Sequence, residues 1–181
     1  SIKSVTAEIN GKSSALSYTV PDTRMQTWLP EALKAGGGNI KLTIRFEFTV
    51  PEYGTDRMGR LKTKNGWVYE IAQWFPRMCV YDDIQGWNTM PYLGAGEFYL
   101  EYGDIDFTVT APSDLIIAGS GELQNPQDCY TPEQMKRWNA AKASDKTVMI
   151  RSDGEVTDPS SRPKQPNCTW KFKITNTRDV A

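Results

Sequence analysis

A strict alternation of apolar and polar residues from Asn39 to Val50 constrains the fold of this chain most. Successive side chains of a β-strand point to opposite faces, so the pattern predicts a strand with one face on a core and the other in water. Half-buried strands of this kind are typical of antiparallel sheets. We therefore expect Ile44 and Phe46 to be buried, and Arg45 and Glu47 to be solvated.

The same alternation recurs in two later segments, Asp104–Pro112 and Cys168–Thr175. Shorter strand candidates are Lys3–Ile9, Leu16–Val20, Glu97–Tyr102, Leu115–Ala118 and Thr147–Arg151. The dipeptides that favour hairpin turns, because they tolerate positive φ, are Asn10-Gly11, Asn65-Gly66 and Asp153-Gly154. Many short strands with turn signals between them predict an all-β fold, an antiparallel β-sandwich that forms a single domain over residues 1–181.

One short helix is expected in a connection between strands, in the stretch YTPEQMKRWNAAKAS. Thr131 is the expected N-cap, Pro132 takes the first helical position, and Gln134 completes a capping box. The expected buried stripe is Met135, Trp138 and Ala141. We interpret this helix as a cover for one end of a sheet.

Two segments are interpreted as exposed loops. Leu33–Gly38 has three consecutive glycines, which cannot hold regular structure cheaply. Asp153–Asn167 is rich in proline, serine and charge, so a mobile insertion is expected there.

The composition excludes several classes of function. The chain has 181 residues, with 21 Lys and Arg against 22 Asp and Glu, so it has no electrostatic footprint for nucleic acid or an anionic membrane. It has no apolar run long enough for a membrane-spanning segment. It has no histidine, which removes His-based triads and the commonest catalytic zinc ligand. The three cysteines, Cys79, Cys129 and Cys168, allow one disulfide plus a free thiol, or none. Cys79 is interpreted as a core thiol.

Carboxylates recur near aromatic residues, and they raise the question of carbohydrate chemistry. These acids are Asp82, Asp83, Glu97, Glu101, Asp104 and Asp106. Two carboxylates about a sugar bond would make a glycosidase, and Trp67, Trp74 and Trp87 could be stacking platforms for a carbohydrate-binding module. However, acids at strand starts are common turn chemistry, so Asp82 and Asp83 are interpreted as turn and capping acids. The Asp104 and Asp106 pair lacks the ligand pattern of an EF-hand, and LGAGEFYLEYG fits no phosphate loop.

Four segments, taken in order, resemble a known domain: WFPRMCVYDDIQGWN, YLGAGEFYLEYGDIDFTVTAP, SGEL and TWKFKITNTRDVA. They look like the N-terminal domain of a bacterial zinc aminopeptidase of the aminopeptidase N family, the gluzincin aminopeptidases. The resemblance covers Gly36 to Ala181. It implies a saddle-shaped β-sandwich whose closing strands run into a thermolysin-like catalytic domain. Residues before Gly36 resemble the middle of such a domain, so the chain is interpreted as a fragment that lacks the first strands.

The family's catalytic apparatus has no counterpart in this sequence. That apparatus is a GxMEN strand and an HExxH helix with a downstream Glu, in which two His and one Glu bind zinc. The chain therefore holds no catalytic residue, metal ligand or cofactor, and zinc belongs to the catalytic domain of the parent enzyme. The final NTRDVA resembles the sequence just before that domain, so we expect the chain to stop at the domain border and to be inactive alone.

The resemblance also implies roles for individual residues. In the family, a Gln or Glu in a TQ-x-E-like stretch helps to fix the free α-amine of the peptide substrate. Gln73 matches that Gln, whereas the acidic position two residues later is Phe75 here. Trp74, Arg178 and Asp179 are the expected contacts with the catalytic domain. The side chains of Cys79 and Tyr81 are expected to pack inward.

The sequence thus predicts a non-catalytic N-terminal domain that packs against a zinc aminopeptidase domain and lines one wall of its substrate cleft. Its expected partners are that catalytic domain, in the same polypeptide, and the peptide substrate. The alternative is a free-standing β-sandwich that binds carbohydrate or protein. An exported location is favoured over a cytoplasmic one, as in related bacterial enzymes.

Overall fold

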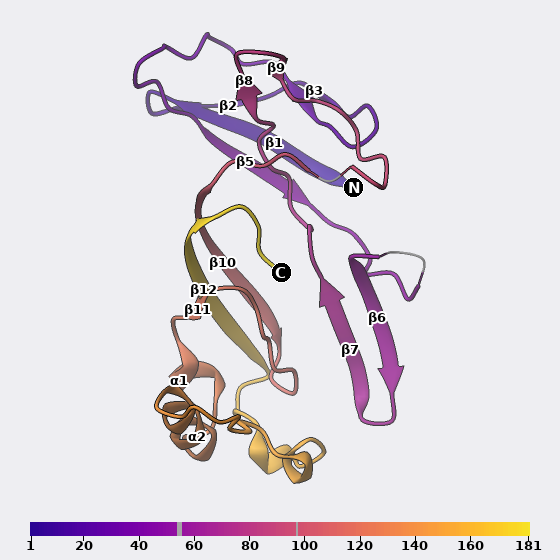
Figure 1. Ribbon diagram of the computed structural model, residues 1–181, viewed down its shortest axis with the longest axis vertical. Helices are drawn as coiled ribbons and strands as arrows, with labels where there is room; N and C mark the ends of the chain where they lie inside the picture. The colour runs from indigo at the N-terminus through magenta and orange to yellow at the C-terminus, as the bar shows by residue number, and fades with distance from the viewer. Residues whose placement is uncertain (54–55, 97) are drawn as a thin grey trace. The chain divides into compact units, whose positions relative to one another are not determined.

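The computed structural model describes residues 1–53, 56–96 and 98–181 (Figure 1). Across these residues the strands form five antiparallel sheets of two or three strands each, which confirms the predicted all-β fold. The predicted helix is present, and a single helical turn of four residues precedes it. The face-to-face packing of a sandwich stays a prediction. The chain divides into two compact units, one of residues 1–50 and 77–99 and the other of residues 51–76 and 100–181. We call them the first and second units, and the single domain also stays a prediction.

The first unit is built on a three-stranded sheet in the order β2-β1-β5. Its strands are β1 (Ile2–Ile9), β2 (Lys12–Ala15) and β5 (Lys41–Phe46). Asn10 and Gly11 connect β1 to β2 with φ of 51° and 75°, which confirms the predicted hairpin because such a two-residue turn needs positive φ. Three residues, Val5, Ala7 and Leu16, form the buried cluster of this sheet.

The alternation of the 39–50 segment is confirmed within β5, but its apolar side chains are less buried than expected. Ile44 and Phe46 are half-buried and Arg45 is exposed, and the strand ends at Phe46. The expectation that Ile44 and Phe46 are fully buried is therefore wrong. A three-stranded sheet with a small buried cluster does not cover the whole apolar face of its edge strand.

Four very short strands complete the first unit. They are β3 (Tyr18–Thr19) paired with β4 (Gln26–Thr27), and β8 (Tyr81–Asp82) paired with β9 (Gly86–Trp87). The predicted strand from Leu16 to Val20 is thus reduced to the two residues of β3.

The second unit is built on a sheet in the order β10-β12-β11. Its strands are β10 (Gly103–Pro112), β11 (Glu122–Leu123) and β12 (Asn167–Thr177). In the register of β10 and β12, Phe107 lies opposite Phe172 and Val109 opposite Trp170. Trp170 and Phe172 are buried while Phe107 and Val109 are half-buried, so both long alternating segments are strands, as predicted.

Two helices pack beside this sheet, α1 (Pro126–Cys129) and α2 (Pro132–Lys142). The capping box of α2 is confirmed: the Thr131 hydroxyl accepts from Gln134 N, and the Gln134 side chain accepts from Thr131 N. Met135 and Trp138 pack against the core cluster, which comprises Cys129, Tyr130, Cys168, Trp170 and Phe172. Gln134 is buried and donates to the Ser161 carbonyl at 2.9 Å, which links α2 to the segment before β12.

The second unit also contains the hairpin of β6 (Met58–Thr63) and β7 (Gly66–Ile71). The hairpin turn predicted at Asn65-Gly66 is present, although Gly66 already pairs with Thr63. Two 3-10 turns follow α2, η1 (Asp153–Glu155) and η2 (Pro159–Ser161). The mobility expected for Asp153–Asn167 stays a prediction.

Several local predictions were wrong. Asp153-Gly154 forms part of η1 and not a hairpin. The N-cap residue of η1 is Ser152, whose backbone N–H donates to the Glu155 carboxylate, and this carboxylate also pairs with Arg137. No strand forms at 115–118, 147–151 or 98–102. Glu97, the first residue of the last candidate, lies outside the described residues.

Candidate functional site

Gln73 lies just beyond the last backbone hydrogen bond of the β6–β7 hairpin, which Ala72 N donates to Arg57 O at 2.9 Å. Its φ is 53°, in the left-handed region, and its side chain is half-buried. A non-glycine residue pays about 1–2 kcal/mol for this conformation. Strained residues of this kind concentrate at functional sites, so the conformation favours a role for Gln73, although its contact with a substrate stays a prediction.

Trp74 and Phe75 follow directly and form an edge-to-face pair, with ring centroids 5.0 Å apart. Both side chains are half-buried. Phe75 therefore places an aromatic side chain two residues after Gln73.

Arg178 and Asp179 follow β12 in the same unit as Gln73 and Trp74. The Arg178 guanidinium lies over the Tyr102 ring, 4.4 Å from its centroid. Asp179 accepts from Val180 N at 2.7 Å, and Val180 is buried. Within this chain, both predicted interdomain residues thus contact their own unit, and their contact with another domain stays a prediction.

Asp82 is a turn acid, as predicted. Its carboxylate accepts from Gln85 N at 2.7 Å, from Asn88 Nδ2 at 2.8 Å and from Ile84 N at 3.0 Å. These bonds, that of Gln85 foremost, lower the pKa of Asp82 because they stabilise its charged form. The Asp82 carboxylate therefore stabilises the β8–β9 turn, and its hydrogen bonds are made within that turn and to Asn88 just after β9. Asp83 beside it is exposed.

The orientation expected for the residues before Asp82 was partly wrong. Tyr81 is 65% exposed, Cys79 is half-buried, and Val80 between them is the buried side chain at 2%. Tyr81 packs edge-to-face against Trp87 across the β8–β9 pair, with centroids 5.2 Å apart. This aromatic pair is therefore a surface feature.

Large exposed side chains recur along the described residues between 78 and 99, which belong to the first unit, and we call them the 78–99 apolar surface. Its described members are Met78, Tyr81, Ile84, Trp87, Met90, Tyr92, Leu93, Phe98 and Tyr99. Ile84 is 88% exposed and Met90 82%, and Tyr92 stacks on Phe98 at 5.3 Å. Concentrated exposed apolar area marks interaction sites in folded proteins. The sequence analysis singled out Trp87 as a possible stacking platform but did not predict exposed apolar side chains at Met90, Tyr92 and Leu93.

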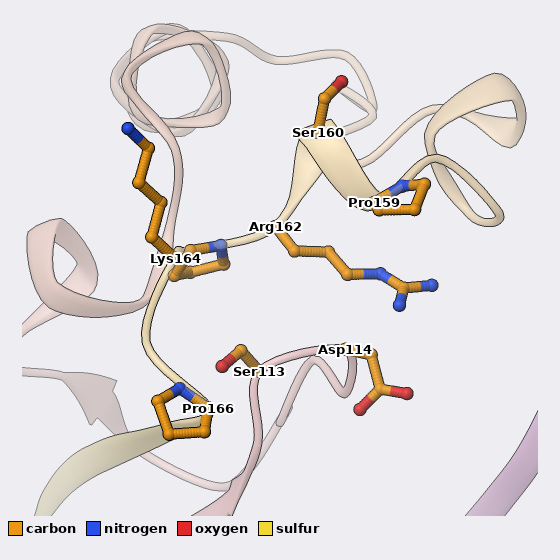
Figure 2. Close-up of a pocket in the computed structure, with 8 residues that line it drawn as sticks. Ser113, Asp114, Pro159, Ser160, Arg162, Lys164 and Pro166 are labelled. Carbon is orange, nitrogen blue, oxygen red and sulfur yellow. The ribbon is translucent and has the colours of Figure 1, made fainter.

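A pocket of about 490 Å³ lies in the second unit, between the turn after β10 and the segment around η2 (Figure 2). Figure 2 shows the Arg162 guanidinium above Asp114 and the Lys164 ammonium directed away from it. The Ser113 hydroxyl donates to Gln165 O, and the Ser160 hydroxyl donates to Asp158. The two cations diverge and both hydroxyls are engaged, so the pocket offers neither an activated nucleophile nor a convergent anion site.

Two further sequence candidates, Asp104 and Asp106, lie on β10. Asp104 accepts from Asn176 N at 2.9 Å, and Asp106 lies opposite Lys173 in the register of β10 and β12. Within residues 1–53, 56–96 and 98–181, no group of three or more His, Cys, Asp or Glu could hold a metal ion. None of the helices in this part of the chain is long and apolar enough to cross a membrane.

Comparison with known proteins returned no matching family model, no matching curated protein and no matching solved structure.

Proposed function

We propose that this chain is a non-catalytic β domain that packs against the catalytic domain of a zinc aminopeptidase and lines one wall of its substrate cleft. The observation that carries the proposal is the 78–99 apolar surface, because apolar side chains this exposed gain free energy when a partner covers them. The resemblance of the 74–123 and 169–181 segments to the aminopeptidase N family supports the identity of the partner.

The residue composition of the chain favours a non-catalytic role beside the catalytic domain. The sequence has no histidine to serve as a zinc ligand or general base. Zinc would be bound by the catalytic domain, where it would activate the water that attacks the peptide bond. Gln73 would contribute a polar contact to the free α-amine of the peptide, from a backbone conformation that is already strained.

Hydrogen exchange in the full-length polypeptide tests the packing. Amides in residues 71–83 and 175–181 should exchange more slowly there than in the chain Ser1–Ala181, because the catalytic domain covers them. The amides of the β6–β7 turn at Lys64 and Asn65 are the internal control and should exchange equally in both proteins. Equal exchange in both test segments would refute the packing and leave the free-standing binding module as the better interpretation.

A matched pair of surface variants tests the apolar surface itself. Ile84→Asp in the full-length enzyme should lower its thermal stability, because a charge would be buried at the interface. Leu61→Asp, at a 65% exposed position on β6, is the control and should have little effect. Equal behaviour of the two variants would argue against a buried interface at Ile84.

Kinetics test the role of Gln73 separately. Gln73→Ala should raise KM for peptides with a free amine by about tenfold, the loss expected for one hydrogen bond to a charged group. Gln127→Ala, at an exposed position of α1, is the control. Unchanged KM and kcat in Gln73→Ala would remove Gln73 from the site but leave the packing proposal intact.

A further inference from the structure

Two of the three cysteines lie together in the core of the second unit. Cys129 is the last residue of α1 and is 3% exposed, and Cys168 is near the start of β12 and is 2% exposed. Both belong to the cluster around Trp170. Cys79 is half-buried and belongs to the first unit.

The two thiols make reciprocal contacts with each other's neighbours. Cys129 Sγ lies 3.3 Å from the carbonyl oxygen of Thr169, which follows Cys168. Cys168 Sγ lies 3.8 Å from the carbonyl oxygen of Asp128, which precedes Cys129. Each sulfur is thus held against the backbone beside the other cysteine.

Hydrogen bonds that do not involve the thiols also hold α1 against β12. Asn125, the N-cap residue of α1, donates to Thr169 O at 2.8 Å and accepts from Lys171 N at 2.9 Å. Asn125 is itself buried. The N-terminus of α1 is therefore tied to the strand that carries Cys168, and Cys129 at the other end of this four-residue helix is held beside that strand.

We propose that Cys129 and Cys168 form an intramolecular disulfide by exchange with a disulfide oxidant, either a small molecule or a protein. The thiolate of one cysteine attacks a sulfur of the oxidant and releases its first thiolate, which leaves a mixed disulfide. The thiolate of the second cysteine then attacks the cysteine sulfur of that mixed disulfide and releases the second thiolate. Two electrons pass to the oxidant, and its two thiolates take up the two cysteine protons.

The bond should form most readily while the chain folds, because both thiols are buried in the folded core and an oxidant has little access to them there. Burial, together with the neighbouring Cys168, raises the pKa of the Cys129 thiol to about 12. At neutral pH the attacking thiolate is then on the order of one molecule in 100,000. In the unfolded chain both thiols are accessible to the oxidant.

The cross-link would close a loop of about 40 residues that contains α2, η1 and η2. Loop closure restrains the unfolded chain most when the loop is long. The disulfide would therefore enclose the segment predicted to be mobile, Asp153–Asn167, and anchor its C-terminal end at Cys168. This inference does not depend on the aminopeptidase proposal, since every contact that supports it lies within the second unit.

Peptide mapping tests the pairing. The reduced, unfolded chain is refolded in a buffer of oxidised and reduced glutathione, blocked with N-ethylmaleimide, digested and analysed by mass spectrometry. We expect one cross-linked peptide joining Cys129 to Cys168, with Cys79 alkylated. Cys79→Ser should give the same cross-link, whereas Cys129→Ser and Cys168→Ser should give none. Absence of the cross-link, or a pair that includes Cys79, would overturn the proposal.

Thermal unfolding of the wild-type chain provides a second test that needs no variant. The disulfide form should unfold at a midpoint about 10 °C above the dithiol form, the shift expected for a loop of this length. The two forms are compared at one protein concentration, with Cys79 blocked in both. A midpoint equal to or below that of the dithiol form would show that the native core does not accommodate the bond, which refutes the proposal.

Discussion

Trp170 gives the sharpest test of how the second unit is held together. The side chain is 1% exposed and packs edge-to-face on Tyr130, with centroids 5.3 Å apart. Among the described residues, its indole Nε1 is buried without a hydrogen-bond partner. Trp170→Ala removes the whole ring from the core and should destabilise the unit by about 3–5 kcal/mol.

Trp170→Phe separates packing from polarity at the same site. The smaller ring should cost about 1–2 kcal/mol in contacts and cavity, whereas removal of the unpaired N–H should return about 1–3 kcal/mol of desolvation free energy. The stability of the variant should therefore lie between about 1 kcal/mol below and about 2 kcal/mol above that of wild type. We would measure hydrogen exchange of the β12 amides against urea, because two compact units need not unfold together. If Trp170→Phe costs as much as Trp170→Ala, the indole N–H is not an energetic burden.

Three further predictions concern local structure. Phe46→Ala should cost about 1–2 kcal/mol in urea melts, because its ring is half-buried, while Arg45→Ala should cost well under about 1 kcal/mol; equal losses would mean that the register of β5 is wrong. Gly121→Ala should cost about 2–4 kcal/mol, because φ is 85° and the added Cβ would meet a carbonyl oxygen of β12; a neutral result would contradict this backbone. The Arg137 side chain, followed by hydrogen bonds from Ser152, lowers the pKa of Glu155 from 4.5 to about 2. This pair should stabilise the chain above about pH 4.5 and lose that effect as pH falls toward 2, so the thermal midpoint of Glu155→Gln should fall less over that range than that of wild type.

The long strands could be predicted because each repeats its pattern several times. β10 and β12 span 10 and 11 residues, so their buried faces were defined by three or more apolar positions. The capping box of α2 could also be predicted, since it depends only on Thr131, Pro132 and Gln134. These features are local, and their side chains agree with the final packing.

The short elements could not be predicted, because their neighbours in space decide them. Asp153-Gly154 suits a hairpin or a 3-10 turn equally well, and the contact of Glu155 with Arg137 favours the turn. Likewise β8 is two residues long, so alternation could not tell that Val80 points inward and Tyr81 outward.

The proposed function depends on two features that sequence alone does not reveal, a strained backbone at Gln73 in the second unit and exposed apolar side chains at residues 78–99 in the first unit. Each is a cost to the folded chain, the first by its conformation and the second by its contact with water. A domain that meets a partner recovers the second cost on association. Positive φ also occurs at Asn10 in the β1–β2 turn, so the conformation of Gln73 fits either a turn or a side chain oriented toward a ligand. The two features can therefore be tested independently. Hydrogen exchange tests whether a partner covers the apolar side chains, and the kinetics of Gln73→Ala test whether Gln73 contacts a substrate.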